Sequence, residues 1–244
     1  MLDAAGYVRL ASGPFTLIAS TAGPMPAYQP GHAHCDALAF ELSIGDERVV
    51  TDTGVAEYVP GALREASRAT RSHATLEVGD ADQAELWAAH RVGGRPRVSL
   101  FAVEPGRRFE ATCAGWSTPD SVHRRVVELG PDGVEVRDAL EGRARSVRLA
   151  LPLAPGLEPR LEADRVRVRL PSGAWVRFDL PGELRFSLER APYFPEFGRT
   201  QDRAVLVGRG DKLGAARLRV SVADAITKPA GSREAPRARP RPRR

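Results

Sequence analysis

The feature that most constrains this chain is an alternation of apolar and polar residues with a period of two. The stretch "ALAFELSIG" (37–45) shows it, and so do residues 166–180 around the turn "PSG" and residues 218–222. Such alternation is typical of antiparallel strands with one buried and one solvent-exposed face. Turn sequences recur at short, even spacing: "GPDG" (130–133), "PSG" (171–173), "PG" (181–182) and "GRGD" (208–211). We therefore expect an all-β fold, an antiparallel two-sheet β-sandwich with short helical loop segments.

One segment departs from the alternation. "GALREASRATRSH" (61–73) is rich in helix formers and has no strand pattern. It predicts a loop with a turn or two of helix.

The charge distribution divides the chain near Lys228. Residues 229–244 hold six Arg, one Glu and four Pro, with no apolar side chain larger than Ala. The other 228 residues carry 30 basic and 30 acidic side chains. We expect a β-sandwich domain over 1–228 and a disordered Arg/Pro-rich tail over 229–244, which either holds acidic polymers or is simply solvated. A neutral body argues against nucleic acid as a partner.

Cysteine usage and hydropathy say little about compartment. Two cysteines, Cys35 and Cys113, do not make a disulfide framework. The first fifteen residues lack the basic and apolar regions of a secretion signal, and no run of 18 apolar residues occurs. We expect a soluble chain with no membrane span.

The histidines are few and two of them are close together. His32 and His34 stand two residues apart, so on an extended segment both rings would face one ion. A hairpin with "GDE" as its turn would return Asp52 beside His34, and His73 can reach the same edge across the 61–73 loop. Imidazoles with one carboxylate are a zinc-compatible ligand set. Alternatively, these histidines are ordinary surface or core residues, since H-x-H alone is not specific.

Other residues are given lesser or no roles. Cys35 points away from His34 by alternation, so packing is expected of it rather than metal ligation. His90 and His123 have no polar cluster beside them in the sequence, and no role is expected for them. A cupin would need a glutamate four or five residues after the second histidine, whereas Glu41 lies seven after His34.

Three stretches together resemble a known family. They are "QPGHAHCDALAFELSIGDERVVTDTG", "RATRSHATLEVGDADQAELW" and "HRVGGRPRV". Their G-H-x-H-x-D, D-x-G and R-x-H elements, with the D-Q-x-E-x-W tail, are similar to the C-terminal β-sandwich region of the heparinase II/III-like polysaccharide lyases. The similar stretch covers about residues 6–110, and the remaining strands are compatible with the same sandwich.

The resemblance implies roles for individual residues. It implies a structural zinc ion held by His34, Asp52 and His73, and a catalytic role in β-elimination for His32. The family commonly has Asn where this chain has Ala74, so a contact made by that amide is in doubt. The motif "DQAELW" (82–87) is expected to pack and cap, with Trp87 anchoring its loop.

The implied substrate is an acidic, uronate-containing polysaccharide such as a glycosaminoglycan. Tyr58 is a candidate substrate contact or else a packing residue. Arg71, and with it Arg68, are candidates for pairing with sugar carboxylates, because a guanidinium matches a carboxylate bidentately; a solvated role is the alternative.

Lyases of this family also carry an N-terminal helical toroid that supplies a catalytic tyrosine, and residues 1–30 offer no replacement. We therefore expect a lyase module that is incomplete alone and needs a helical toroid domain or subunit. The alternative is a non-catalytic, zinc-stabilised sandwich that binds glycans or another subunit. The family suggests a periplasmic, cell-envelope or extracellular location, which the sequence does not specify.

Overall fold

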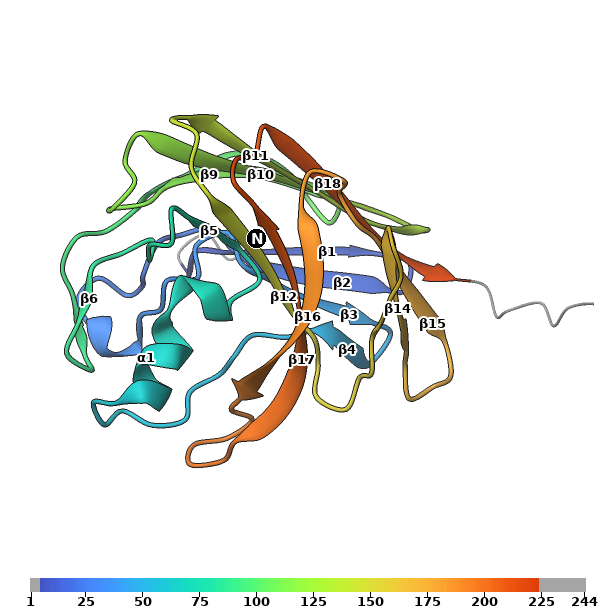
Figure 1. Cartoon of the computed structure of the whole chain (residues 1–244), viewed down its shortest axis with the longest axis horizontal. Coiled ribbons are helices and arrows are strands. Elements are labelled where there is room, and N and C mark those ends of the chain that lie inside the picture. Colours follow the sequence, from blue (N-terminus) through green and yellow to red (C-terminus); the bar gives the residue numbers. More distant parts are fainter. Residues whose placement is uncertain (1–4, 224–244) are drawn as a thin grey trace, which may run out of the picture.

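The chain folds as two packed layers of antiparallel strands (Figure 1). A computed structural model describes residues 5–223; the predicted tail at 229–244 lies outside these residues. One layer is an eight-stranded sheet whose strands, in spatial order, are β13 (Arg160–Leu161), β14 (Arg165–Arg169), β15 (Trp175–Asp179), β18 (Ala215–Ala223), β11 (Gly133–Gly142), β10 (Ser121–Gly130), β9 (Arg108–Ala114) and β8 (Arg97–Glu104).

The second layer consists of two four-stranded sheets. The first contains, in order, β1 (Tyr7–Ser12), β2 (Phe15–Ser20), β3 (Phe40–Ile44) and β4 (Glu47–Val50). The second contains β16 (Arg185–Tyr193), β17 (Gln201–Gly210), β12 (Val147–Pro152) and β5 (Leu76–Val78). A bridge between Val50 and Leu153 joins the two. The predicted all-β sandwich is confirmed, with one of its layers divided.

The loops carry the remaining elements. A two-stranded ribbon is formed by β6 (Leu86–Trp87) and β7 (Arg91–Val92). Helical segments are α1 (Ala62–Arg68) and the 3₁₀ turns η2 (Pro30–His32) and η3 (Thr70–Ser72). The helical loop expected over 61–73 is therefore confirmed. No helix within residues 5–223 is long and apolar enough to cross a bilayer.

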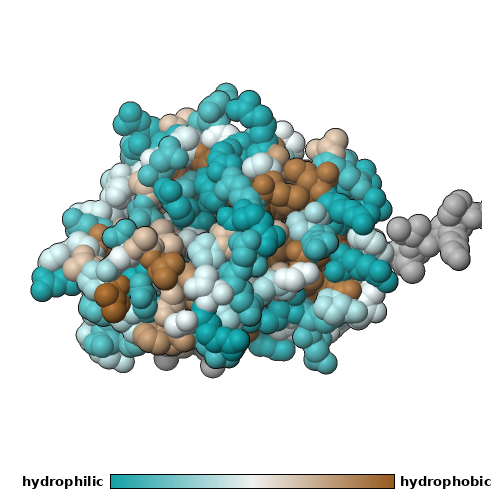
Figure 2. Space-filling view, turned by 60° about the horizontal axis from the view of Figure 1, so that its bottom comes forward, coloured by the Kyte–Doolittle hydropathy of each residue, from teal (hydrophilic) through white to brown (hydrophobic). Residues whose placement is uncertain are grey.

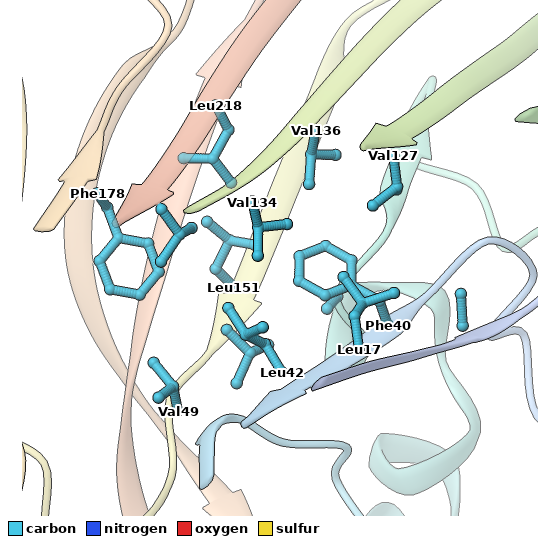
Figure 3. Close-up of a cluster of buried hydrophobic side chains, with 14 of the residues drawn as sticks. Leu17, Phe40, Leu42, Val49, Val127, Val134, Val136, Leu151, Phe178 and Leu218 are labelled. Atoms are coloured by element: carbon cyan, nitrogen blue, oxygen red, sulfur yellow. The ribbon is translucent and has the colours of Figure 1, made fainter. Parts of the chain in front are cut away.

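The core lies between the two layers, where the alternating apolar residues meet. Figure 3 shows Leu17, Phe40 and Leu42 pointing toward Val134 and Phe178 of the eight-stranded sheet. All five side chains are at most 3% exposed. Burial of apolar area on this scale is the main favourable term in folding such a sheet pair. The face of the molecule seen in Figure 2 is mostly hydrophilic, with separate hydrophobic patches.

Two details of the first sheet differ from the sequence expectation. The strand expected from Leu38 begins at Phe40, because Leu38 has a left-handed backbone with φ 62°. The hairpin turn at 45–46 is confirmed, but a bulge between Leu42 and Ser43 shifts the register so that Leu42 pairs with Val50. The chain leaves the sheet after Val50, and Asp52 therefore follows the strand instead of ending it.

Candidate functional site

Three ends of secondary structure bring His34, Asp52 and His73 together. His34 follows η2, Asp52 follows β4, and His73 lies between η3 and β5. One potential ligand atom from each of the three lies within 4.8 Å of the others. His73 Nδ1 is 2.5 Å from Asp52 Oδ1, and the two imidazole centroids are 5.3 Å apart. The structure thus brings together the three residues that the sequence predicted as metal ligands.

The electrostatics of the trio follow from burial and from the His73–Asp52 contact. Burial lowers the pKa of His34 to about 3, with the nearby His73 acting in the same direction, so His34 is neutral. Burial alone would raise the pKa of Asp52, but the attraction of His73 and its hydrogen bond outweigh it and hold that pKa below the ordinary value. Burial alone would lower the pKa of His73, but the attraction of Asp52, the hydrogen bond with it and the attraction of Asp36 together outweigh burial and raise that pKa.

A metal cation fits this donor set. The Nε2 atoms of His34 and His73 are buried and have no hydrogen-bond partner among the described residues. A buried polar atom left without a partner costs free energy. Two imidazole nitrogens and a carboxylate are a common ligand set for zinc.

His32 and His34 do not face one ion, which corrects the expectation drawn from an extended segment. His32 ends the 3₁₀ turn η2, and Ala33 after it is extended, with ψ 139°. The change of backbone between the two histidines separates their rings. His32 is exposed, and its Nδ1 lies 2.9 Å from Tyr58 Oη.

Tyr58 is the centre of an aromatic group. Its ring meets the His32 ring edge-on, with 5.4 Å between centroids. His90 and Phe197 stack on it at 6.1 and 5.8 Å, and the Arg64 guanidinium lies 4.8 Å from the ring centroid. His90, for which no role was expected from the sequence, therefore lies beside the candidate site.

A hollow connects the two parts of the site. About 220 Å³ in volume, it is lined by His32, His34, Asp36 and Asp52 together with residues from the start of β1, the end of β2 and the segments flanking these two strands. Burial raises the pKa of Asp36 to about 6, and the repulsion from Asp52 adds to that effect. A ligand in this hollow would meet the exposed imidazole of His32 on one side and the predicted metal ligands on another.

The two arginines proposed as substrate contacts lie elsewhere. Arg68 is 2% exposed and donates to the main-chain oxygens of Ala33, Ala88 and Arg91, so it has no free face for a sugar carboxylate; that expectation is wrong. Arg71 has an exposed side chain paired with Glu77 at 2.9 Å. It lines a second hollow, of about 520 Å³, and the structure does not bring it to His32.

The "DQAELW" motif packs and caps as expected, except at its last residue. Asp82 accepts a hydrogen bond from the amide of Thr70, and the Gln83 side chain makes two bonds to the main chain of Ala37. Trp87 is 50% exposed with Arg91 over its ring, so it does not anchor the loop by burial.

Both cysteines are buried and free, as packing residues would be. Burial raises the pKa of Cys35 and of Cys113 to about 12. Neither thiol is therefore a thiolate at neutral pH.

Sequence reasoning missed the buried polar residues that surround the site. Arg125 and Arg203 are 0% and 1% exposed. Arg125 forms a bidentate pair with Asp138, and His123 Nε2 lies 2.7 Å from the same carboxylate. The expectation that His123 has no polar cluster is wrong. A signal was present: in "SVHRRVVELG" alternation puts His123 and Arg125 on the same face as Val127 and Leu129.

The fold and the site define a class: an antiparallel β-sandwich with a partly buried His/Asp cluster at the edge of one layer. The sequence matches the family model described as "Heparinase II/III-like, C-terminal" over residues 1–236. The chain therefore belongs to the heparinase II/III-like C-terminal domain family. No curated protein sequence matches it significantly.

Solved lyases share the fold. The heparan sulfate lyase HepC of Pedobacter heparinus is 20% identical with a TM-score of 0.71, and the match covers 92% of this chain and 36% of that one. A heparinase III gene product is 16% identical with a TM-score of 0.71, covering 90% and 35%. The chain thus spans about a third of the length of these lyases. A putative aldose 1-epimerase of Escherichia coli shares the fold more distantly, at 9% identity and a TM-score of 0.51, with 89% and 98% covered.

Proposed function

We propose that this domain is the sandwich part of a lyase that cleaves acidic, uronate-containing polysaccharides by β-elimination. The observation that carries the proposal is the division of labour between two neighbouring histidines. His32 is exposed and paired with the Tyr58 hydroxyl, whereas His34 turns inward to Asp52 and His73. The first pair has the groups for proton transfer, and the second has the groups of a metal site.

Zinc is the metal we propose for the inner trio, held by His34, Asp52 and His73. Bound there, it would supply structural cross-linking of three loop segments and neutralise the Asp52 carboxylate. The two buried Nε2 atoms without partners support this assignment. Neither cysteine belongs to the group of potential ligand atoms that lie within 4.8 Å of one another.

In the elimination, a base removes the proton at C5 of the uronate and an acid protonates the departing glycosidic oxygen. The C4–O bond breaks and a C4=C5 double bond forms. His32 is the group we propose for one of these transfers, with Tyr58 fixing its ring through the Nδ1 contact. Arg71, which is exposed but lies apart from His32, is proposed as an outlying contact for a carboxylate of the polymer.

A second protein element completes the site in this proposal. A hollow of 220 Å³ lined by one exposed histidine offers one wall for a sugar ring, and β-elimination needs groups on several sides. Misplacing a catalytic group by about 1 Å can cost 10²-fold in rate. The match covers only 36% and 35% of these two related lyases, and a helical domain or subunit is the partner we propose.

The test follows formation of the unsaturated product by its ultraviolet absorbance, with heparan sulfate, alginate and hyaluronan as substrates. We expect the chain alone to turn these substrates over very slowly. We expect addition of a helical partner to restore activity, and the His32→Ala substitution to remove the restored activity. Asp211→Asn, at an exposed position in the loop before β18, is the matched control and should behave as the parent. Robust turnover by the chain alone would overturn the need for a partner. Activity unaffected by His32→Ala would overturn the assigned role of His32.

A further inference from the structure

All three candidate metal ligands lie in main-chain segments that buried arginines hold. In each case a guanidinium donates to a carbonyl group of the ligand residue itself or of its immediate neighbour. The three contacts are Arg68 Nε to Ala33 O (3.0 Å), Arg203 Nη1 to Asp52 O (3.0 Å) and Arg125 Nη1 to Ala74 O (2.7 Å).

These arginines come from three regular elements and are at most 2% exposed. Arg68 ends α1, Arg125 is on β10, and Arg203 is on β17. Removing a guanidinium from water is costly, and such groups persist where several hydrogen bonds compensate. Arg125 has the Asp138 carboxylate as its partner, whereas no described carboxylate lies within 4.0 Å of Arg68 or Arg203. The last two are buried cations whose described hydrogen-bond partners are carbonyl and hydroxyl oxygens.

Arg203 holds two of the ligand segments at once. Its Nη1 also donates to Thr51 O at 2.9 Å, and its Nη2 donates to Thr53 Oγ1 at 2.7 Å. The Thr53 hydroxyl in turn donates to Ser72 O, the carbonyl directly before His73. A continuous path therefore runs from β17 through Arg203 and Thr53 to the main chain of both Asp52 and His73.

We propose that Arg68, Arg125 and Arg203 are positioning residues that hold His34, Asp52 and His73 in metal-binding geometry before a metal arrives. This inference rests on the proposed zinc site and goes beyond it, because it assigns the site's preorganisation to this chain's own cations. The planar guanidinium is suited to this, since its donors point in fixed directions and can hold several oxygens at once. A lysine ammonium keeps the charge but loses that fork.

The expected effect is on metal affinity more than on folding. Changing groups that orient metal ligands typically weakens binding about 10- to 100-fold. Arg203→Lys and Thr53→Val should both fall in that range, because each breaks the path from β17 to the ligand segments. Thr53→Ser keeps the hydroxyl and should bind zinc as the parent does.

The experiment measures zinc affinity by competition with a chromogenic chelator, and the geometry of the site by the visible spectrum of bound Co²⁺. Each variant's metal-free melting temperature is measured beside them. Ser121→Ala is the matched control: that buried hydroxyl donates to Arg143 O at 2.8 Å, away from the ligands, so its loss can lower stability but not affinity. If Arg203→Lys fails to fold, the comparison of zinc affinity between Thr53→Val and Thr53→Ser tests the inference alone.

The outcomes separate the two claims. The inference is supported if the parent binds zinc, if Thr53→Val and Arg203→Lys bind zinc more weakly, and if Thr53→Ser binds zinc as tightly as the parent. A parent that binds zinc while these variants bind it equally tightly overturns the inference and leaves the proposed metal site standing. A parent that binds no zinc overturns the proposed metal site, and the inference with it.

Discussion

Arg125, Asp138 and His123 form a charged cluster inside the sandwich, between the eight-stranded sheet and the loops of the candidate site. Arg125 and Asp138 are cross-strand partners of β10 and β11, and Arg125 also donates to Leu38 O and Ala74 O. The pKa of His123 is lowered, mainly by burial, although Asp138 opposes the effect. A buried ion pair thus links the core to the segment that follows His73.

This cluster predicts a pH dependence of stability. Between pH 7 and 5 the unfolded chain protonates His123, whose ordinary pKa is about 6.5, while the folded chain resists protonation. The unfolded state then binds more protons, so the free energy of unfolding falls as pH falls, by at most about 1.4 kcal/mol per pH unit for this group. Asp138 adds little in this window, since its pKa is below the ordinary value.

Urea unfolding of the parent and of His123→Gln at pH 7 and pH 5 measures this contribution. The variant should lose less stability over that interval than the parent. Equal losses in the two proteins would show that His123 does not titrate differently on folding.

Some positions of the candidate site could be predicted from the sequence and others could not. His34, Asp52 and His73 were predicted because a hairpin and a loop bring sequence neighbours to one edge. The separation of the His32 and His34 rings was not predicted, because it depends on the 3₁₀ turn at Pro30–His32, where an extended chain was expected. Arg203 was missed because its partners at 51–53 are about 150 positions away in the sequence.

At the scale of elements, the segment after β4 that contains Asp52 makes a close backbone contact at Gly54. Gly54 has φ 77° and forms a parallel bridge with Phe194. A Cβ at this position would lie 2.2 Å from Phe194 O. Only glycine fits here without moving the segment that holds Asp52 and Thr53.

Gly54→Ala is therefore expected to be destabilising beyond the cost of its backbone conformation. Gly45→Ala in the β3–β4 turn is the matched control, because φ is 59° there and a Cβ would meet no heavy atom within 4 Å. The control should lose about 1–2 kcal/mol from left-handed strain alone. Chemical denaturation should give a clearly larger loss for Gly54→Ala, and equal losses would mean that the contact with Phe194 relaxes freely.

The strands themselves were largely predictable, since period-two alternation survives wherever one face is buried. β14, β15 and β3 follow it residue by residue. The division of the second layer into two sheets was not predictable, because it depends on pairing between β5 and β12, whose paired residues lie about 70 positions apart. The bulge opposite Leu42 and Ser43 was also missed: Val49 is the extra residue on β4, where the alternation breaks and Val49 and Val50 are both buried.

At the scale of the whole molecule, the sandwich has its own hydrophobic core. The Arg/Pro-rich composition of residues 229–244 provides no large apolar side chains that could add to this core. Deleting 229–244 should leave the melting temperature unchanged, because these residues have no apolar side chain larger than Ala. Differential scanning calorimetry of the two chains checks this. A marked drop on truncation would mean that the tail packs against the domain.

Family membership and fold link this domain to lyases of whose length it matches about a third, while the claim specific to its chemistry is the metal site. Elemental analysis of the purified protein, beside His34→Ala and a Ser121→Ala control, tests that claim most directly. We expect about one zinc per chain in the parent and in the control, and loss of that zinc in His34→Ala with the β-sheet circular dichroism retained. A parent without transition metal, or a His34→Ala variant that holds as much zinc as the parent, would contradict it.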